Sequence, residues 1–419
     1  MPGTGPVDVD FLEAPCSQET AEEVIRDVTR SDIPPSRNLG TFVSPECDPH
    51  IDTLVRRWSR HNLINRAEYP GVTILEHRCL AMLRHLWHGS ADTGGCATTG
   101  SSEAAVIAAA ELLRRWRKQN HDQQPNLVLG PTAHTCWLRF CMFWNVEPRL
   151  LPPRQGEPIS DPAAVASSCD AGTIGAVATL GSPEFGLYDP VHEVSTALDE
   201  LHARTGLDIP LHVDAASGGF VAPFLQPEFP WDFRLDRVVS INASGHKYGL
   251  TRPSVGWLLW RTSWSTMDEL ALAAPYIGTG APEPTLSFSR PSAPVVEQYL
   301  QLIRRGRSGY RATHLRSRDI AERVARQLAE QPDIEVLSGG SDLPVVTFTA
   351  GSPASAAVTD LTTSLADKGW HIPVYQSRTP THPTTGRIVV RSDMSSDLVD
   401  ELTTDIARAS HTFAAKGES

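Results

Sequence analysis

An aspartate and a lysine stand at the ends of two apolar segments of this 419-residue chain. Asp214 ends LHVD, and Lys247 lies 33 positions later in SGHKYG. This separation allows one strand, a crossover and a return into the same parallel sheet, so both side chains should reach one sheet edge. A lysine can form a Schiff base with an aldehyde, and a carboxylate can keep a pyridine nitrogen protonated, so the pair suits pyridoxal phosphate. The alternative is a surface lysine and a strand-end aspartate that never meet.

A second motif could bind the phosphate of such a cofactor. A glycine-rich turn at residues 92–100 leads into Ser101, Ser102 and an alanine-rich helix at 104–117. A helix N-terminus offers unpaired N–H groups and the positive end of a dipole, and two serine hydroxyls add donors. Ser followed by an acid is also an ordinary helix-capping pattern. Together with Lys247, the motif favours a phosphate site.

The surrounding sequence resembles a known family. HVDAASGGFVAPF, the WDFR of residues 231–234 and INASGHKYGL are similar to the glutamate decarboxylases, which belong to the group II pyridoxal-phosphate-dependent decarboxylases. The similarity runs from about residue 38 to about residue 391. It implies an α/β protein of fold type I, like aspartate aminotransferase, with a mostly parallel seven-stranded large-domain sheet and a small C-terminal α/β domain.

The expected domains are an N-terminal segment at 1–37, a large cofactor-binding domain at 38–317 and a small domain at 318–419. By resemblance the N-terminal segment packs on a partner subunit, although it could also be a loosely ordered tail. Short apolar runs alternate with helical segments, which predicts a parallel sheet that is covered on both faces and binds ligands at its strand ends. The predicted strands of the large sheet are 126–130, 173–180, 211–215, 237–243 and 255–261. The small domain reads as βαβ-like.

The resemblance also implies cofactor contacts. Lys247 would carry the aldehyde, Asp214 would face the ring nitrogen, and Ser101 and Ser102 would hold the phosphate. His134 would stack on the ring, with the methyl group of Ala216 on the opposite face. Ser244 and His246 are further expected contacts, His246 also as a catalytic residue. Ser289 would reach the phosphate of the neighbouring subunit, which implies an obligate homodimer with shared active sites, possibly within a higher homo-oligomer.

The family carries a tyrosine at the spacing of Tyr276, which makes it a candidate proton donor. The proton could instead come from His134 or Lys247, which would leave Tyr276 a structural loop residue. Thr41 and Phe42 match residues that hold the distal end of the substrate. Arg387, expected to open the last strand, matches the arginine that receives the substrate carboxylate, since a guanidinium donates two parallel hydrogen bonds. A surface ion pair is the other explanation for this arginine.

Two positions depart from the family pattern. Asn65 stands where an aspartic acid helps to bind the distal carboxylate, and Pro183 stands where a threonine is common. Asn65 can still donate a hydrogen bond, whereas Pro183 has no donor. By resemblance the substrate is glutamate, with a smaller or less acidic amino acid as the alternative.

We therefore expect a carboxy-lyase that releases carbon dioxide and gives an amine. A related pyridoxal-phosphate enzyme, such as a decarboxylation-dependent transaminase or an oxidative variant, would use the same Lys247 and Asp214. A non-catalytic homologue is the third possibility.

Composition limits the partners. The chain has 37 Lys and Arg against 49 Asp and Glu, a net charge of −12, which disfavours nucleic acid and anionic membranes. Seven cysteines without a paired metal-ligand spacing fit free thiols in a reducing cytosol. No signal peptide or membrane-spanning apolar run is present, so we expect a cytoplasmic protein. No metal site is expected, because His77, His85 and His88 have no further ligand nearby.

Overall fold

The structure is a computed structural model. It describes residues 14–43, 48–119, 123–154, 157–265, 267–272, 283–352, 356–376 and 384–414. The helices are α1 (Gln18–Val28), α2 (Pro49–Arg56), α3 (Pro70–Leu86), α4 (Ser101–Gln119), α5 (Thr135–Trp144), α6 (Pro162–Ser167), α7 (Val191–Thr205), α8 (Ala222–Leu225), α9 (Met267–Leu270), α10 (Ala293–Ala329), α11 (Ala357–Ala366) and α12 (Ser396–Ala414). Short 3-10 turns cover Thr29–Ser31, Pro35–Arg37 and Gly218–Phe220.

The large sheet has seven strands in the order β1-β7-β6-β5-β4-β2-β3. Its strands are β1 (Gly94–Thr98), β2 (Asn126–Leu129), β3 (Glu147–Leu150), β4 (Thr173–Thr179), β5 (Leu211–Asp214), β6 (Val238–Ser244) and β7 (Gly256–Trp260). The five strands from β6 to β3 are parallel, whereas β7 and β1 are antiparallel to their neighbours. The seven-stranded, mostly parallel sheet predicted from the sequence is confirmed.

Helices cover both faces of this sheet. The apolar sides of α4 and α5 pack on β2 and β4 in one core cluster. A larger cluster joins α3, α7 and α10 to side chains of β4, β5 and β6. Because both faces are covered, every residue of β4, β5 and β6 is buried. This explains why these strands are rich in apolar residues and why even their polar residues are buried.

The glycine-rich turn predicted at residues 92–100 was partly wrong, because it contains strand β1. Gly94 pairs with Trp260, and a Cβ added at Gly94 would lie 2.5 Å from the indole nitrogen of Trp260. Glycine is therefore needed here so that the strand can pass close to a large ring. The glycines that suggested a turn in fact permit an edge strand.

The small sheet differs more from the prediction. Its four strands, β8 (Ile334–Gly339), β9 (Val345–Ala350), β10 (Val374–Gln376) and β11 (Thr384–Val389), are ordered β10-β11-β9-β8 and are all antiparallel. The predicted βαβ-like unit is present as β9, α11 and β10, whose two strands run in the same direction with β11 between them. Strand β8 was not predicted, and Arg387 lies inside β11, not at its start.

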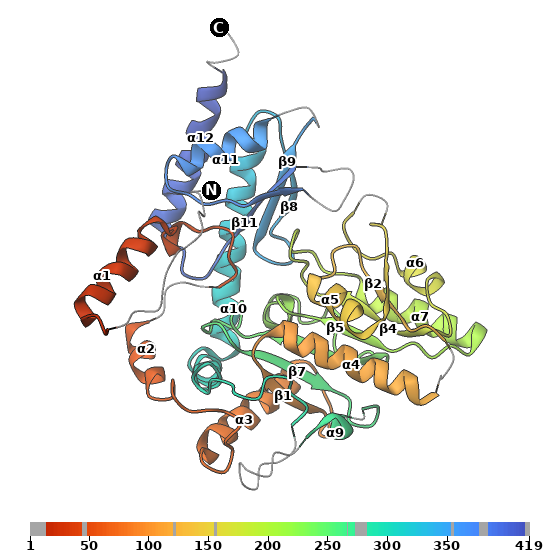
Figure 1. The fold of residues 1–419 in the computed structure, drawn as a ribbon. Helices are drawn as coiled ribbons and strands as arrows, with labels where there is room; N and C mark the ends of the chain where they lie inside the picture. Colours follow the sequence, from red (N-terminus) through yellow and green to blue (C-terminus); the bar gives the residue numbers. More distant parts are fainter. Residues whose placement is uncertain are drawn as a thin grey trace.

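Helix α10 and the segment around Leu39 connect the large-sheet part of the molecule to the small-sheet part. Helix α10 runs from the large sheet to the small one and bends at Gly306, whose φ is 56° (Figure 1). Leu39 packs in the core of the small part, where its N–H donates to the His371 carbonyl and its carbonyl accepts from Val389. The expected division at residues 37/38 and 317/318 stays a prediction, although Leu39 contributes to the second core. Among the described residues, no helix is long and apolar enough to cross a membrane.

Candidate active site

A cavity of about 330 Å³ opens where β4, β5 and β6 end and where α4 begins. Nine residues predicted from the sequence line it: Ser101, Ser102, His134, Pro183, Asp214, Ala216, Ser244, His246 and Lys247. Thr179 and Cys136, which the sequence analysis did not identify, line it as well. The size is in the range of small-molecule sites.

Asp214 is held by three N–H donors at the end of β5. Its Oδ1 accepts from Asn242 Nδ2 at 2.9 Å and from the N–H of Ala216 at 3.2 Å. Its Oδ2 accepts from the indole N–H of Trp137 at 2.8 Å. The side chain is 3 % exposed, so these bonds fix both its orientation and its surroundings. Trp137 and Asn242 were missed by the sequence analysis.

Lys247 reaches the same cavity from the turn after β6. Its Nζ donates to Ser217 Oγ at 3.1 Å and lies 5.0 Å from the centre of the Phe42 ring. Burial lowers the pKa of the Lys247 amine, and the nearby Asp214 carboxylate opposes this shift. A lysine with a lowered pKa supplies more of the neutral amine that attacks an aldehyde.

The start of α4 forms an anion cradle. Glu103 accepts from the N–H and the hydroxyl of Thr99, both at 2.6 Å, so the helix is capped by this pair. Within the described residues, the hydroxyls of Ser101 and Ser102 do not cap the helix. Ser101 Oγ instead accepts from Ser244 Oγ at 2.8 Å, which links the cradle to the end of β6.

The site fits pyridoxal phosphate on an independent observation. Thr179 Oγ1 is buried, lines the cavity and has no hydrogen-bond partner within the described ranges. A buried hydroxyl without a partner costs free energy, so a polar ligand atom in the cavity would satisfy it. The cavity thus offers a lysine amine, a held carboxylate, an anion cradle and one open hydroxyl.

Two histidines and a thiol complete the lining. His134 precedes α5, and its Nδ1 accepts from the N–H of Cys136 at 3.2 Å, which orients the ring; its stacking role stays a prediction. Burial and the charge of Lys247 lower the pKa of His246 to about 4, so His246 is neutral at pH 7. Its Nδ1 lies 3.2 Å from the Val255 carbonyl and therefore carries the proton. Burial raises the pKa of the Cys136 thiol to about 12, which makes it a poor nucleophile.

Arg387 approaches the cavity from the small sheet. Its guanidinium donates to the Pro183 carbonyl and, at 2.8 Å, to the Gly40 carbonyl, and lies 5.3 Å from the Phe42 ring centre. Its Nε is buried without a hydrogen-bond partner in the part of the chain that the structure describes. Burial lowers the pKa of Arg387. The described residues place no carboxylate in an ion pair with it, which argues against the surface ion pair considered above.

The segment that carries Pro183 is held by donors from the small part of the molecule. Four successive carbonyls accept hydrogen bonds: Pro183 from Arg387, Glu184 from Thr347 Oγ1 at 2.7 Å, Phe185 from Ser338 Oγ at 2.6 Å, and Gly186 from the N–H of Leu343 at 3.2 Å. The position of Pro183 in the cavity is therefore set by residues more than 150 positions away.

Five of the predicted residues that the structure describes do not line the cavity: Thr41, Phe42, Asn65, Ser289 and Arg387. Asn65 Nδ2 donates to Glu68 at 3.0 Å, and Ser289 Oγ accepts from Asn62 at 3.2 Å. The Thr41 hydroxyl accepts from the N–H of Val43, two residues on. Tyr276 lies outside the described residues. The role of Ser289 in a site shared between subunits and the role of Asn65 in binding the distal carboxylate stay predictions.

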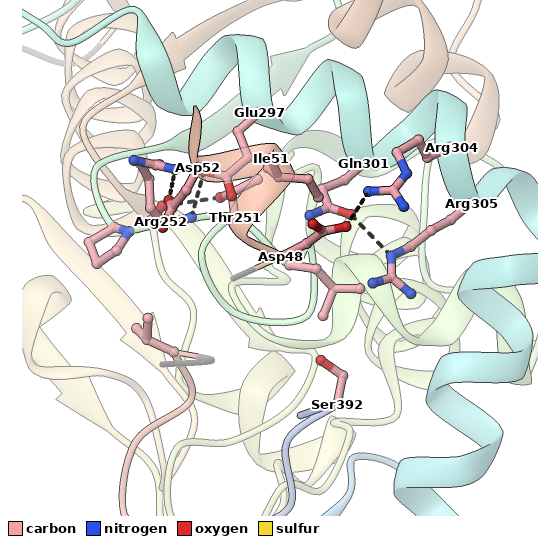
Figure 2. Close-up of a pocket in the computed structure, with 13 residues that line it drawn as sticks. Asp48, Ile51, Asp52, Thr251, Arg252, Glu297, Gln301, Arg304, Arg305 and Ser392 are labelled. Atoms are coloured by element: carbon pink, nitrogen blue, oxygen red, sulfur yellow. Dashed lines mark hydrogen bonds and ion pairs between the residues drawn. The ribbon is translucent and has the colours of Figure 1, made fainter. Parts of the chain in front are cut away.

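A larger cavity, of about 510 Å³, lies between α2, α10 and the turn after Lys247. Figure 2 shows that its charged groups face one another: Arg252 pairs with Asp52 at 2.9 Å and with Glu297 at 2.6 Å, and Arg304 pairs with Asp48 at 3.1 Å. It contains none of the strand-end residues, so the smaller cavity is the candidate site. No cluster of metal-ligating side chains occurs among the residues described.

Comparisons with known proteins agree with this geometry. The family model described as "Pyridoxal-dependent decarboxylase conserved domain" matches residues 51–351. The chain is 37 % identical to a glutamate decarboxylase of Aliivibrio fischeri, over 94 % of this chain and 87 % of that protein. It is 36 % identical to glutamate decarboxylase 5 of Arabidopsis thaliana, over 93 % and 81 % of the two chains. A solved glutamate decarboxylase of Lactobacillus brevis superposes with a TM-score of 0.91 at 30 % identity, covering 96 % of this chain and 94 % of that one.

Proposed function

The chain belongs to the pyridoxal-dependent decarboxylase family, and on that premise we propose that it converts L-glutamate to 4-aminobutanoate and carbon dioxide. Pyridoxal phosphate is the cofactor of this family, and the enzyme is a carboxy-lyase. One observation supports the substrate class most directly. The Lys247 amine and the Arg387 guanidinium lie 5.0 Å and 5.3 Å from the same Phe42 ring, so the reacting amine and a carboxylate-binding group converge.

Several residues of the site have a role in this proposed reaction. When bound, pyridoxal phosphate supplies an aldehyde and a ring that accepts the electron pair of the bond broken at the α-carbon. Lys247 Nζ would hold the cofactor through its aldehyde. Asp214 would stabilise a proton on the ring nitrogen, and the α4 N-terminus with Ser101 and Ser102 would hold the phosphate.

Arg387 orients the substrate through a carboxylate. Its buried Nε can donate to a carboxylate oxygen, and charge-assisted bonds of this kind are short and directional. Holding the substrate in one orientation selects which bond at the α-carbon breaks. Carbon dioxide leaves, and the α-carbon takes a proton, for which Lys247 Nζ is a candidate donor in the cavity.

A less acidic amino acid is the second candidate substrate. Pro183 lines the cavity and brings no N–H donor, and the Asn65 amide is bonded to Glu68 instead of facing the cavity. A distal carboxylate would therefore find fewer donors within one chain than the family pattern suggests.

We also propose a homodimer in the cytoplasm. Ser289 and Asn65 do not reach the cavity of their own chain, which is expected if each serves the site of a partner. Helix α1 has no buried residue and exposes Val24, Ile25 and Val28 by more than half, so it has an apolar side for a partner to cover. The described cysteines are all free thiols, in line with a reducing compartment.

The test is a panel of amino acids given to the cofactor-loaded protein, with released carbon dioxide and the organic product both measured. We expect glutamate to have the highest kcat/KM and to give an amine. Lys247→Ala should abolish both the reaction and the visible absorption band of the lysine-bound cofactor, whereas the exposed Lys368→Ala should change neither. A carbonyl product, or a clear preference for another amino acid, would refute the assignment.

A further inference from the structure

The buried carboxylate of Asp214 ends a chain of hydrogen bonds that runs along two neighbouring strands. Ser240 Oγ lies 2.7 Å from His212 Nδ1, and His212 Nε2 lies 2.6 Å from Asn242 Oδ1. Asn242 Nδ2 in turn donates to Asp214 Oδ1 at 2.9 Å. None of the four side chains is more than 3 % exposed.

The strand register brings these groups together. His212 is the cross-strand partner of Ser240, and Asp214 is the partner of Asn242. Residues two apart on a strand share a face, so all four side chains lie on one side of the β5–β6 pair. The ring of Trp137 packs beside these hydrogen-bonded side chains, with its centre 5.0 Å from that of the His212 ring. The Trp137 N–H donates to Asp214 Oδ2.

The hydrogen bonds from Ser240 to Asp214 can run in only one consistent direction. Burial lowers the pKa of His212 to about 4, so at pH 7 the ring is neutral and carries a single N–H. Asn242 Oδ1 can only accept, so the proton lies on Nε2, and Nδ1 accepts from the Ser240 hydroxyl. Rotating the Asn242 amide would instead place its oxygen against an Asp214 oxygen. Every donor therefore points towards the carboxylate.

We propose that Ser240, His212 and Asn242 are positioning residues that keep Asp214 ionised and aimed at the ring nitrogen of the bound cofactor. Oδ1 already accepts two hydrogen bonds, whereas Oδ2 accepts one, from Trp137, among the described residues. Oδ2 is thus the oxygen with room for a further donor. Aligned donors make the carboxylate less basic, because each polarises the next. Without them the carboxylate would be aimed less firmly at the ring nitrogen and would stabilise a proton there less.

This inference rests on the cofactor site of the proposed function and not on the choice of substrate, so its test uses a readout other than turnover. Cofactor labelled with 15N in the ring is bound to the protein, and the nitrogen chemical shift is measured by NMR. Wild type should show a protonated nitrogen. His212→Phe keeps a ring beside Trp137 but breaks the chain, and should move the shift towards the unprotonated value and weaken cofactor binding about tenfold.

Ser240→Ala is the milder variant, should His212→Phe fail to fold. It removes only the first donor, so a smaller shift in the same direction is expected. Thr173→Val is the matched control, because it removes a buried hydroxyl bonded to Asn126 at 2.8 Å on β4, away from Asp214. It should cost stability and leave the nitrogen shift unchanged.

An unprotonated ring nitrogen in wild type would overturn the proposal. The proposal would also fail if His212→Phe and Ser240→Ala fold but show the same nitrogen shift and cofactor affinity as the control. The choice of glutamate is judged separately by carbon dioxide release. A wild type with a protonated ring nitrogen and no activity on glutamate would refute the proposed substrate but leave this inference standing.

Discussion

His314 should make the protein sensitive to acid. It lies on α10, is 1 % exposed, and packs against the rings of Phe224, Tyr248 and Tyr310, with centroids 5.8 to 5.9 Å away. Burial lowers its pKa from 6.5 to about 3, and the charge of Arg305 acts in the same direction. A bond to the Phe220 backbone opposes the shift but does not outweigh it.

The sign follows from proton binding. Between about pH 3 and pH 6.5 the unfolded chain protonates this histidine and the folded chain does not, so stability falls as pH drops through this range. At pH 4.5, which is two units below the ordinary histidine pKa of 6.5, protonation of His314 in the unfolded chain lowers the free energy of unfolding by about 3 kcal/mol. At pH 7.5 the effect is close to zero. His314→Phe removes the proton site but keeps a ring in the space.

The measurement is chemical unfolding followed by tryptophan fluorescence at pH 7.5 and pH 4.5, with the same cofactor concentration in every sample. Relative to wild type, His314→Phe should gain about 3 kcal/mol between the two pH values, whatever its stability at pH 7.5. His192→Phe, at an exposed position on α7, is the control and should show no such gain. A gain below about 1 kcal/mol for His314→Phe would show that the folded protein accepts the proton, and the reasoning from burial would fail.

Two further predictions concern the edges of the cavity. Thr347→Val removes the donor to the Glu184 carbonyl and should loosen the segment of Pro183, raising KM severalfold with kcat little changed in steady-state kinetics; a fall in kcat alone would contradict this. Gly256→Ala would place a Cβ 2.3 Å from the carbonyl carbon of Gly100, beside the phosphate cradle. Spectroscopic titration should show at least tenfold weaker cofactor binding, and unchanged affinity would mean that the cradle does not hold the phosphate.

The cofactor side of the site could be predicted from the sequence because its residues follow local rules. The carboxyl ends of parallel strands lie at one edge of a sheet, and this rule placed Asp214 and Lys247 together. A helix that begins after a glycine indicated Ser101. The hydrogen-bonded side chains around His212 could also be recognised in the sequence. Polar residues alternate in HVD and in SINAS within otherwise apolar strands, and such residues in a buried strand need partners on the same face. The sequence indicates the role of Trp137 less clearly, through the fact that the N–H of a buried indole needs a hydrogen-bond acceptor.

The substrate side could not be predicted in the same way. Arg387 donates to the carbonyl of Pro183, 204 positions earlier, and to that of Gly40, 347 positions earlier. Backbone carbonyls carry no side-chain signature, so neither contact has a pattern in the sequence. Strand β8 of the small sheet was missed for a different reason, because it is too exposed to appear as an apolar run.

This division between the two sides has a consequence for specificity. The large sheet and α4 hold the groups proposed to bind the cofactor. The small sheet holds Arg387 and the donors to the carbonyls of residues 183–186. A substitution in β8 or β9 can therefore shift Pro183 without touching Asp214 or Lys247. The distal part of the substrate is expected to be selected through the small sheet, while the chemistry at the α-carbon stays with the parallel strands. Changes in substrate preference should then be accessible without loss of cofactor binding.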